Sequence, residues 1–464
     1  MVDPATFEGC DRSQTLPTLA PSTTTSTLAP APPPSPVVPV CKKNVLFIMC
    51  DDLRFQINPK RIEGTHIMST PNFDLLAGKS VFFPNAACQV GLCAPSRASM
   101  LTSRRPDTTR VWDLATYWRS AGGNFTTIPQ YFRSIPGYKV QGVGKIFHGG
   151  TASGGGATEF GGEPDDLMLS WDDYYHSPND VYYEATGPLR RRRLSPEEED
   201  AVPPPLPGCC VFNDDDTCPT TAKCGPSSYC LVKAHCEGSC NGRWCDNVTS
   251  TFPDQQAILR AYDTIRKGCP RCGNSWADVP PAVEALYPLP DTQNTDEAVR
   301  LLTKEWKESD NFFLAVGFHK PHLPFVAPAR FYDMYPLEEI KMPPNPDTPE
   351  GMPDIAWSES GEMVSYPDIT AELGHSNGFK NHTERLKEQT TLELRRAYYA
   401  CVSHMDEQLG RVLDAIDSGP FAQNTIITLV GDHGYVNGHH GQLFGLVSFC
   451  CCCGGCHSVL LTLC

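Results

Sequence analysis

Four apolar runs, each ending abruptly in charged or histidine side chains, constrain the fold of this chain more than any other feature. Residues 44–50 precede Asp51 and Asp52, and residues 138–144 precede Lys145 and His148. Residues 312–316 precede His319 and His322, and residues 425–430 precede Asp432 and His433. Short apolar runs of this kind are typical of strands buried on both faces of a parallel sheet. Since ligands bind beyond the carboxyl ends of parallel strands, we expect these polar groups to converge on one pocket.

Two amphipathic stretches fit the helical crossovers that a parallel sheet requires. Residues 296–307 have an acidic start and place Val299, Leu302 and Trp306 on one face, and residues 392–416 carry a longer apolar stripe at helical spacing. The sequence therefore predicts an α/β fold in which helices flank a large, mostly parallel sheet.

Three of the groups at the strand ends are carboxylates, Asp51, Asp52 and Asp432. Taken singly, each is more commonly a helix cap or a turn residue. Their shared position at strand ends favours a metal site instead, and hard oxygen donors suit Ca²⁺ or Mg²⁺ far better than zinc.

Residues 93–97 read Cys-Ala-Pro-Ser-Arg, which alone could be a loop cysteine ahead of a helical turn. The pentapeptide belongs to an ordered series, which consists of residues 51–54 (Asp-Asp-Leu-Arg), 70–74 (Thr-Pro-Asn-Phe-Asp), 93–97, 101–110 (Leu-Thr-Ser-Arg-Arg-Pro-Asp-Thr-Thr-Arg) and 144–148 (Gly-Lys-Ile-Phe-His). This order and spacing resemble the sulfatases, a family with the alkaline phosphatase-like fold, over roughly residues 44–441. Residues 121–132 and 314–325 resemble more narrowly the iduronate-2-sulfatase group of that family.

The resemblance implies a nucleophile made from a cysteine and a bound calcium ion (Ca²⁺). In sulfatases the formylglycine-generating enzyme oxidises the motif cysteine to formylglycine (3-oxoalanine) before final folding, and the hydrated aldehyde supplies the attacking oxygen. The matching residue here is Cys93. The implied metal ligands are Asp51, Asp52, Cys93, Asp432 and His433.

The resemblance also implies how charge and protons are handled. Negative oxygens screen the sulfur of a sulfate ester, so we expect the cation, Arg97, Lys145 and His148 to neutralise charge before attack. Asp432 or a nearby carboxylate would assist the attack as a base, and His322 would give a proton to the departing sugar alcohol. His148 would then act as the base when the sulfated intermediate expels sulfate.

Five further residues are weaker candidates. His319 could simply orient its turn, and a surface or supporting role is favoured over metal ligation for His439 and His440. Cys401 and His404 lie within the second predicted helix and are interpreted as packing or surface residues.

The composition suits a protein of the secretory pathway, lysosomal or extracellular, and argues against a nucleic-acid binder. The formal charge is −16 and the pI about 5.2, whereas phosphate backbones require a basic surface. The 22 cysteines and the glycosylation sequons at Asn124, Asn247 and Asn381 fit an oxidising, lumenal environment. No signal peptide is recognisable, and no stretch is long and apolar enough to span a bilayer.

The catalytic domain is expected at residues 41–442, after a disordered segment at 1–40 that is rich in Ser, Thr and Pro. An insert at 205–275 interrupts this domain and contains ten cysteines from Cys209 to Cys272. We favour a disulfide-stapled insert with a binding role, because the segment offers little apolar material for a core of its own.

Two alternatives stay open in and near this insert. Cys269 and Cys272 alone could form half of a zinc site. Arginines at 190–193 precede acidic residues at 197–200, and we interpret them as a solvated loop, with binding of an anionic polysaccharide as the alternative.

Residues 443–464 depart from the sulfatase pattern. Where the family places a lysine that contacts sulfate, the chain reads Phe444-Gly445-Leu446, and cysteines dominate residues 450–456. We interpret this tail as aberrant, resembling translated non-coding sequence, with a genuine metal-binding or cross-linked tail as the alternative. The carboxyl-terminal subdomain of the family is therefore expected to be truncated.

These observations leave two classes of function. The first is a sulfuric ester hydrolase that removes sulfate from a sulfated saccharide, which the resemblance suggests is a 2-O-sulfated uronate in a glycosaminoglycan-like chain. The second is a catalytically inactive, sulfatase-like protein that binds glycans or a protein partner. The intact residues 93–97 and the strand-end groups favour the first, and the tail favours reduced activity.

Overall fold

The computed structural model describes residues 43–54, 57, 68–83, 86–160, 162–176, 267–352, 361–376, 378–381 and 384–441, and the backbone of residues 460–463. All of them lie in the unit that spans Lys42–Cys464. The predicted disordered segment at 1–40, the charged runs at 190–200 and most of the cysteine-rich insert lie outside the described residues.

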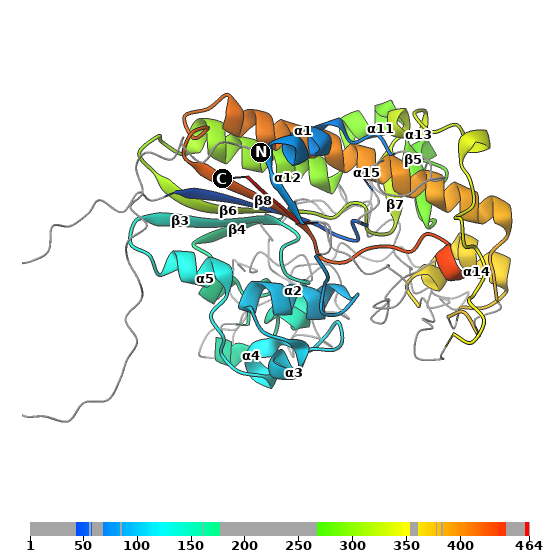
Figure 1. Ribbon diagram of the computed structural model, residues 1–464, viewed down its shortest axis with the longest axis horizontal. Helices are drawn as coiled ribbons and strands as arrows, with labels where there is room; N and C mark the ends of the chain where they lie inside the picture. The colour runs from blue at the N-terminus through cyan, green and yellow to red at the C-terminus, as the bar shows by residue number, and fades with distance from the viewer. Residues whose placement is uncertain are drawn as a thin grey trace, which may run out of the picture. The chain divides into compact units, whose positions relative to one another are not determined.

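A seven-stranded sheet in the order β2-β9-β8-β1-β6-β3-β4 dominates the described part of the chain (Figure 1). Its strands are β1 (Asn44–Cys50), β2 (Val81–Phe83), β3 (Tyr138–Gly144), β4 (Asp173–Tyr175), β6 (Asn311–Phe318), β8 (Thr425–Gly431) and β9 (Leu460–Leu463). The central strands β8, β1, β6, β3 and β4 pair in parallel. β9 pairs antiparallel with both β8 and β2.

Helices cover both faces of this sheet (Figure 1). On one face lie α1 (Pro71–Lys79), α12 (Pro290–Arg300) and α15 (Glu388–Asp417), and on the other lie α2 (Cys93–Thr102), α3 (Pro106–Thr109), α4 (Trp118–Ala121) and α5 (Ile128–Arg133). The remaining α-helices are α6 (Leu167–Ser170), α11 (Pro281–Leu286), α13 (Ala329–Tyr332) and α14 (Pro367–Leu373). None of the described helices has the length and apolar character needed to cross a bilayer.

The two faces of the central strands build two separate cores. Along β1, Leu46 and Ile48 pack into the core beneath α12 and α15, whereas Phe47 and Met49 pack into the core on the α2 side. Successive side chains of a strand point to opposite faces, so a strand that is buried on both faces must be apolar at nearly every position. This explains the uninterrupted apolar runs in the sequence.

The four predicted strands are confirmed. β1 and β3 have the predicted bounds, and β8 extends one residue further, to Gly431. β6 is longer than predicted because Asn311 and the segment up to Phe318 continue the pairing with β1 and β3.

The two predicted helices fare differently. The second is confirmed as α15 (Glu388–Asp417), which begins four residues before and ends one residue after the predicted stretch. The first was placed wrongly at 296–307, because α12 begins at Pro290, ends at Arg300 and continues as a π-helical turn, Leu301–Glu305. Proline suits the first helical position, since its missing N–H would have no partner there.

A smaller two-stranded parallel sheet pairs β5 (Trp276–Val279), which follows the predicted insert in sequence, with β7 (Phe325–Pro328). A disulfide joins Cys269 to Cys272 just before β5, which supports the disulfide interpretation over the zinc half-site for this pair. Both cysteines pack with Ala277, Val279 and Val326 in a small third core.

The strand β9 was not predicted. Its four residues belong to the segment that we interpreted as an aberrant tail, yet their backbone pairs with β8 and β2. The rest of residues 443–464 lies outside the described residues, so the interpretation of the tail stays a prediction.

Candidate active site

The carboxyl ends of β1 and β8 bring the predicted acidic residues together. The two strands are parallel neighbours, and Cys50 at the end of β1 pairs in register with Gly431 at the end of β8. The Asp432 N–H donates to the carbonyl of Cys50 (3.2 Å), and the Asp51 N–H donates to a carbonyl of β6 (3.2 Å). Sheet hydrogen bonding thus sets where both acidic segments leave the strands.

Cys93 joins this group from the first turn of α2. Its Sγ lies 3.4 Å from Asp51 Oδ1 and 3.2 Å from His433 Nε2. Asp51, Asp52, Cys93 and His433 each present one potential ligand atom, and these atoms lie within 4.8 Å of one another. Asp432 lies beside them, with Oδ2 3.6 Å from His433 Nε2. The structure therefore brings all five predicted metal ligands together, and all five are buried.

Two cations lie against the carboxylates. The guanidinium of Arg97, which is fully buried, places Nε 2.8 Å from Asp432 Oδ2 and Nη2 3.3 Å from Asp51 Oδ1. The ammonium of Lys145 forms an ion pair with Asp51 Oδ2. Arg97 Nη1 also donates to the carbonyls of Lys145 (2.6 Å) and Ile146 (2.9 Å), and so ties the segment after β3 to α2.

The carboxylates are compensated unequally. Burial favours the neutral acid, but Lys145 and Arg97 outweigh it at Asp51 and hold its pKa well below the usual value. Burial and the charges of Asp51 and Asp432 raise the pKa of Asp52 well above the usual value. Burial also raises the pKa of Asp432, with Arg97 acting in the opposite direction. Among the described residues, Asp52 has no lysine or arginine at ion-pair distance and lies 3.0 Å from the His433 ring.

This donor set fits a divalent cation. It combines hard carboxylate oxygens with an imidazole, and it leaves a buried carboxylate, Asp52, without a strong positive partner. A cation held among these groups would relieve the repulsion that raises the pKa of Asp52. The geometry therefore fits a divalent cation, and the assignment to calcium stays a prediction.

The environment of Cys93 disfavours a thiolate. Burial and the neighbouring charge of Asp51 raise the pKa of the thiol well above its usual value. The thiolate is the reactive form of cysteine, so the unmodified side chain is a poor nucleophile in this position. This agrees with a residue whose function requires prior conversion.

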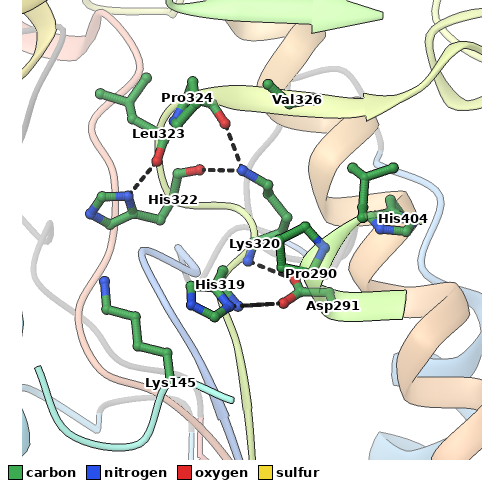
Figure 2. Close-up of a pocket in the computed structure, with 11 residues that line it drawn as sticks. Lys145, Pro290, Asp291, His319, Lys320, His322, Leu323, Pro324, Val326 and His404 are labelled. Carbon is green, nitrogen blue, oxygen red and sulfur yellow. Dashed lines mark hydrogen bonds and ion pairs between the residues drawn. The ribbon is translucent and has the colours of Figure 1, made fainter. Parts of the chain in front are cut away.

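His148 and His322 both face the charges of Lys145 and Asp51. Burial and Lys145 lower the pKa of each imidazole to about 3, so both rings are neutral near pH 7. The Nδ1 of His322 donates to the carbonyl of Leu323 (2.6 Å), which directs Nε2 toward the site. Figure 2 shows the ring of His322 beside the ammonium of Lys145. The Nδ1 of His148 has no hydrogen-bond partner among the described residues.

Three residues near the site were missed in the sequence. Glu362 places Oε1 3.7 Å from His322 Nε2, and burial raises its carboxyl pKa even though 40% of the side chain stays exposed. Asp291 and Lys320 contact the turn that carries His322 (Figure 2). Asp291 follows Pro290, and this pair is a helix-start signal that would have located it. Lys320 lies within residues 314–325, whose resemblance assigned it no role, and no sequence pattern marks Glu362.

The weaker candidates lie outside the cluster of potential ligands. His319 contacts Asp291 through Nδ1 (3.3 Å), as expected for a residue that orients its turn. Cys401 and His404 are fully buried on α15, which confirms the packing interpretation. His439 and His440 are partly exposed in the segment after β8 and take no part in the cluster.

Two of the three predicted glycosylation sites are described. Asn124 is exposed, and its Oδ1 accepts from Arg119. Asn381 is also exposed, whereas Asn247 lies outside the described residues. The exposure of both is compatible with glycan attachment, which stays a prediction.

Comparison with known proteins identifies the family. The family described as Sulfatase matches residues 43–445. The iduronate 2-sulfatases of Mus musculus and Homo sapiens are 34% and 33% identical over 399 residues, which is 86% of this chain but 56% of either relative. The chain thus spans little more than half the length of these relatives. A solved phosphonate monoester hydrolase from Silicibacter pomeroyi has the same fold, with a TM-score of 0.51 and 18% identity, covering 91% of this chain and 68% of that chain. Because the family match extends over most of its length, the chain belongs to the sulfatase family and has the alkaline phosphatase-like α/β fold of sulfatases.

Proposed function

We propose that this chain is a sulfuric ester hydrolase that removes sulfate from a sulfated saccharide. The observation that carries the proposal is the contact of Cys93 with Asp51 and His433 inside a buried cluster of carboxylates and cations. Few reactions need a modifiable cysteine, a cation site and buried Arg and Lys side chains within one pocket. Family membership gives the reaction class independent support.

We infer that Cys93 is converted to formylglycine by the formylglycine-generating enzyme. The hydrated aldehyde, when present, would supply the attacking hydroxyl. Its position at the start of α2 keeps the side chain against Asp51 and His433. The raised thiol pKa supports this inference, because the thiol itself is poorly suited to attack.

Asp51, Asp52, Asp432, His433 and the oxygen of the modified residue 93 would hold a calcium ion. The ion would supply positive charge that offsets the negative oxygens of the sulfate group. Arg97 and Lys145 add two fixed positive charges in the same buried space. Charges in a buried site act more strongly than in water, so these side chains would favour an anionic substrate there.

His322 would give the proton to the departing sugar alcohol. In the structure its imidazole is neutral near pH 7, because burial and Lys145 lower its pKa to about 3. A sulfate ester in the pocket would bring negative charge next to the ring and so counteract Lys145. We therefore propose that His322 gains its proton together with the substrate. His148, also neutral, suits the later role of a base.

We propose a 2-O-sulfated uronate in a glycosaminoglycan-like chain as the substrate. The named activity of the relatives from Mus musculus and Homo sapiens supports this class. The exposed sequons and the Cys269–Cys272 disulfide support a location in the secretory pathway, where the modifying enzyme would also be encountered.

The test is production of the chain in a host that contains the formylglycine-generating enzyme, with mass spectrometry of the Cys93 peptide and assays of sulfate release. The peptide should lose mass relative to the cysteine form and react with hydrazide. Sulfate should be released from a 2-O-sulfated uronide disaccharide or from 4-nitrophenyl sulfate, and Cys93→Ala should abolish this release. An unmodified thiol, or release that survives Cys93→Ala, would refute the proposal. Tight binding of sulfated saccharide without release would favour the inactive, glycan-binding alternative.

A further inference from the structure

The turn between β6 and β7, residues 319–324, carries His322 into the site and is held from behind by two buried charged residues. Figure 2 shows this turn with Asp291 below it and the side chain of Lys320 folded back beneath it. Neither Asp291 nor Lys320 belongs to the cluster of potential metal ligands.

Asp291 anchors the start of the turn. Its side chain, 1% exposed at the beginning of α12, accepts from the backbone N–H of His319 (2.7 Å) and of Lys320 (2.8 Å). The ring of His319 adds a third contact, Nδ1 to Oδ1 at 3.3 Å. A carboxylate that accepts two backbone N–H groups fixes the direction in which the chain leaves β6.

Lys320 anchors the far end of the same turn. Its ammonium donates to the carbonyls of Pro324 (2.6 Å) and His322 (3.2 Å), and the residue is 8% exposed. Among the described residues no carboxylate lies at ion-pair distance from this ammonium. A buried ammonium is costly for stability unless its N–H groups find acceptors, and here they donate to carbonyls of the turn that carries His322.

The orientation of the His322 ring depends on the turn that Asp291 and Lys320 hold. Its Nδ1 donates to the carbonyl of Leu323 inside the turn, as Figure 2 shows. Its Nε2 lies 3.7 Å from Glu362 Oε1. Rotation of the peptide units that Lys320 holds would therefore swing Nε2 away from the reacting atoms. Misplacing a catalytic group by about 1 Å can cost about a hundredfold in rate.

We propose that Lys320 and Asp291 are positioning residues that hold the 319–324 turn so that Nε2 of His322 faces the reaction centre beside Lys145. The inference rests on the proposed function for its catalytic consequence. The orientation of His322 itself is a separate, measurable property.

A small cavity beside the turn guides the choice of variant. It measures about 40 Å³, and its lining includes Lys145, His322, Lys320 and His404. Both ring nitrogens of His404 lack hydrogen-bond partners among the described residues, and the cavity, although mostly lined by apolar atoms, is large enough for water. Truncating Lys320 to alanine would enlarge it, whereas Lys320→Met keeps the volume and removes only the donors and the charge.

The experiment compares wild type, Lys320→Met and Lys320→Arg with a matched control, Lys304→Met, which alters an exposed lysine of the π-helical turn. The Nδ1–H signal of His322 is followed by NMR in protein labelled with ¹⁵N-histidine and assigned with His322→Asn. Steady-state rates on 4-nitrophenyl sulfate are divided by the aldehyde content of each preparation. Where Lys320→Met fails to fold, Asp291→Asn serves in its place, since its amide oxygen still accepts one backbone N–H.

We expect Lys320→Met to shift or broaden the His322 signal and to lower kcat about tenfold to a hundredfold, with KM changed less than about threefold. Lys320→Arg should recover most of both properties, and the control should match wild type. An unchanged His322 signal together with wild-type kcat would overturn the proposal, as would a loss confined to thermal stability. A wild-type protein that carries the aldehyde but releases no sulfate would refute the proposed function alone, because the NMR comparison still tests the positioning.

Discussion

The acidic side and the histidine side of the site are held in place by different means. Asp51, Asp52, Asp432 and His433 directly follow β1 and β8, so the parallel register of the sheet determines their spacing. His322 lies in a turn outside the sheet and depends on side-chain contacts with Asp291 and Lys320. The contrast teaches that the backbone register of a sheet sets the position of groups at strand ends, even though their charges still need cations, whereas the position of a loop residue itself depends on buried polar anchors.

The largest expected effect concerns the acidic side, where like charges are packed closely. Arg97→Met would leave Asp51 and Asp432 buried without their shared guanidinium. Removing one partner of a buried ion pair costs about 3–5 kcal/mol of unfolding free energy, measured by urea denaturation. The control is Arg133→Met, which breaks the exposed pair with Asp172 and should cost about 0–1 kcal/mol. Equal losses in the two variants would mean that the acidic side is not specially dependent on its cations.

The second prediction concerns the repulsion among the carboxylates of the acidic side, which a bound metal ion should reduce. Calcium should raise the melting temperature of wild-type protein, because it binds the folded state at Asp51, Asp52, Asp432 and His433. At a hundredfold excess over Kd the gain is about 2.7 kcal/mol. Asp52→Asn removes the least compensated carboxylate and should abolish most of the calcium effect. Differential scanning calorimetry with calcium and with a chelator checks this, and identical melting curves in wild type would count against a metal site.

The third prediction concerns how the free energy of unfolding depends on pH through the neutral ring of His322. The pKa of His322 is about 3 in the folded protein and near 6.5 when unfolded, so the folded state prefers the neutral ring. This contribution to stability is fully present above pH 6.5 and is lost as the pH falls from 6.5 toward 3. Between pH 7 and 5 the loss amounts to about 2 kcal/mol for one such histidine. His322→Gln should therefore be less destabilised than wild type on acidification, and parallel pH profiles would rule out a neutral, buried ring.

The smallest effect concerns Glu362, which faces His322 from the partly exposed edge of the site. Burial raises the pKa of its carboxyl to about 7, so near neutral pH it carries only part of its negative charge, and this charge opposes the approach of an anionic substrate. Glu362→Gln should lower KM for 4-nitrophenyl sulfate about twofold to threefold at low salt, and the difference should shrink as ionic strength rises. Glu339→Gln, at an exposed position outside the site, is the control. A higher KM in Glu362→Gln would indicate that the carboxyl group binds the substrate instead.

Elements that leave a local pattern in the sequence could be predicted from it. β1 and β3 were located with the observed bounds, because strands buried on both faces leave uninterrupted apolar runs. The start of α12 was missed because its buried face is polar there, with Asp291, Asn294 and Thr295 taking positions where an apolar stripe is expected. A periodicity search cannot detect a buried face built from polar groups.

Among the site residues, those directly beyond the strands could be predicted, together with Cys93 and Arg97 from their motif. Lys320 and Glu362 could not, because their importance arises from contacts with residues 322 to 324 and with His322 that only the folded chain creates. The strand β9 could not be predicted from the sequence either, since its neighbours β8 and β2 come from distant parts of the chain.

The burial of Cys93 limits the time during which a modifying enzyme can reach its side chain. Its thiol contacts His433, which lies 340 positions later in the chain. Ribosomes add about 5–20 residues per second, so roughly 20 to 70 seconds separate the synthesis of the two residues. β1, the central strand of the sheet, likewise waits for β6 and β8 before it gains a neighbour. Any enzyme that modifies Cys93 therefore has a window that opens when the motif emerges and closes when β8 docks, and variants that fold faster should carry less of the modified residue.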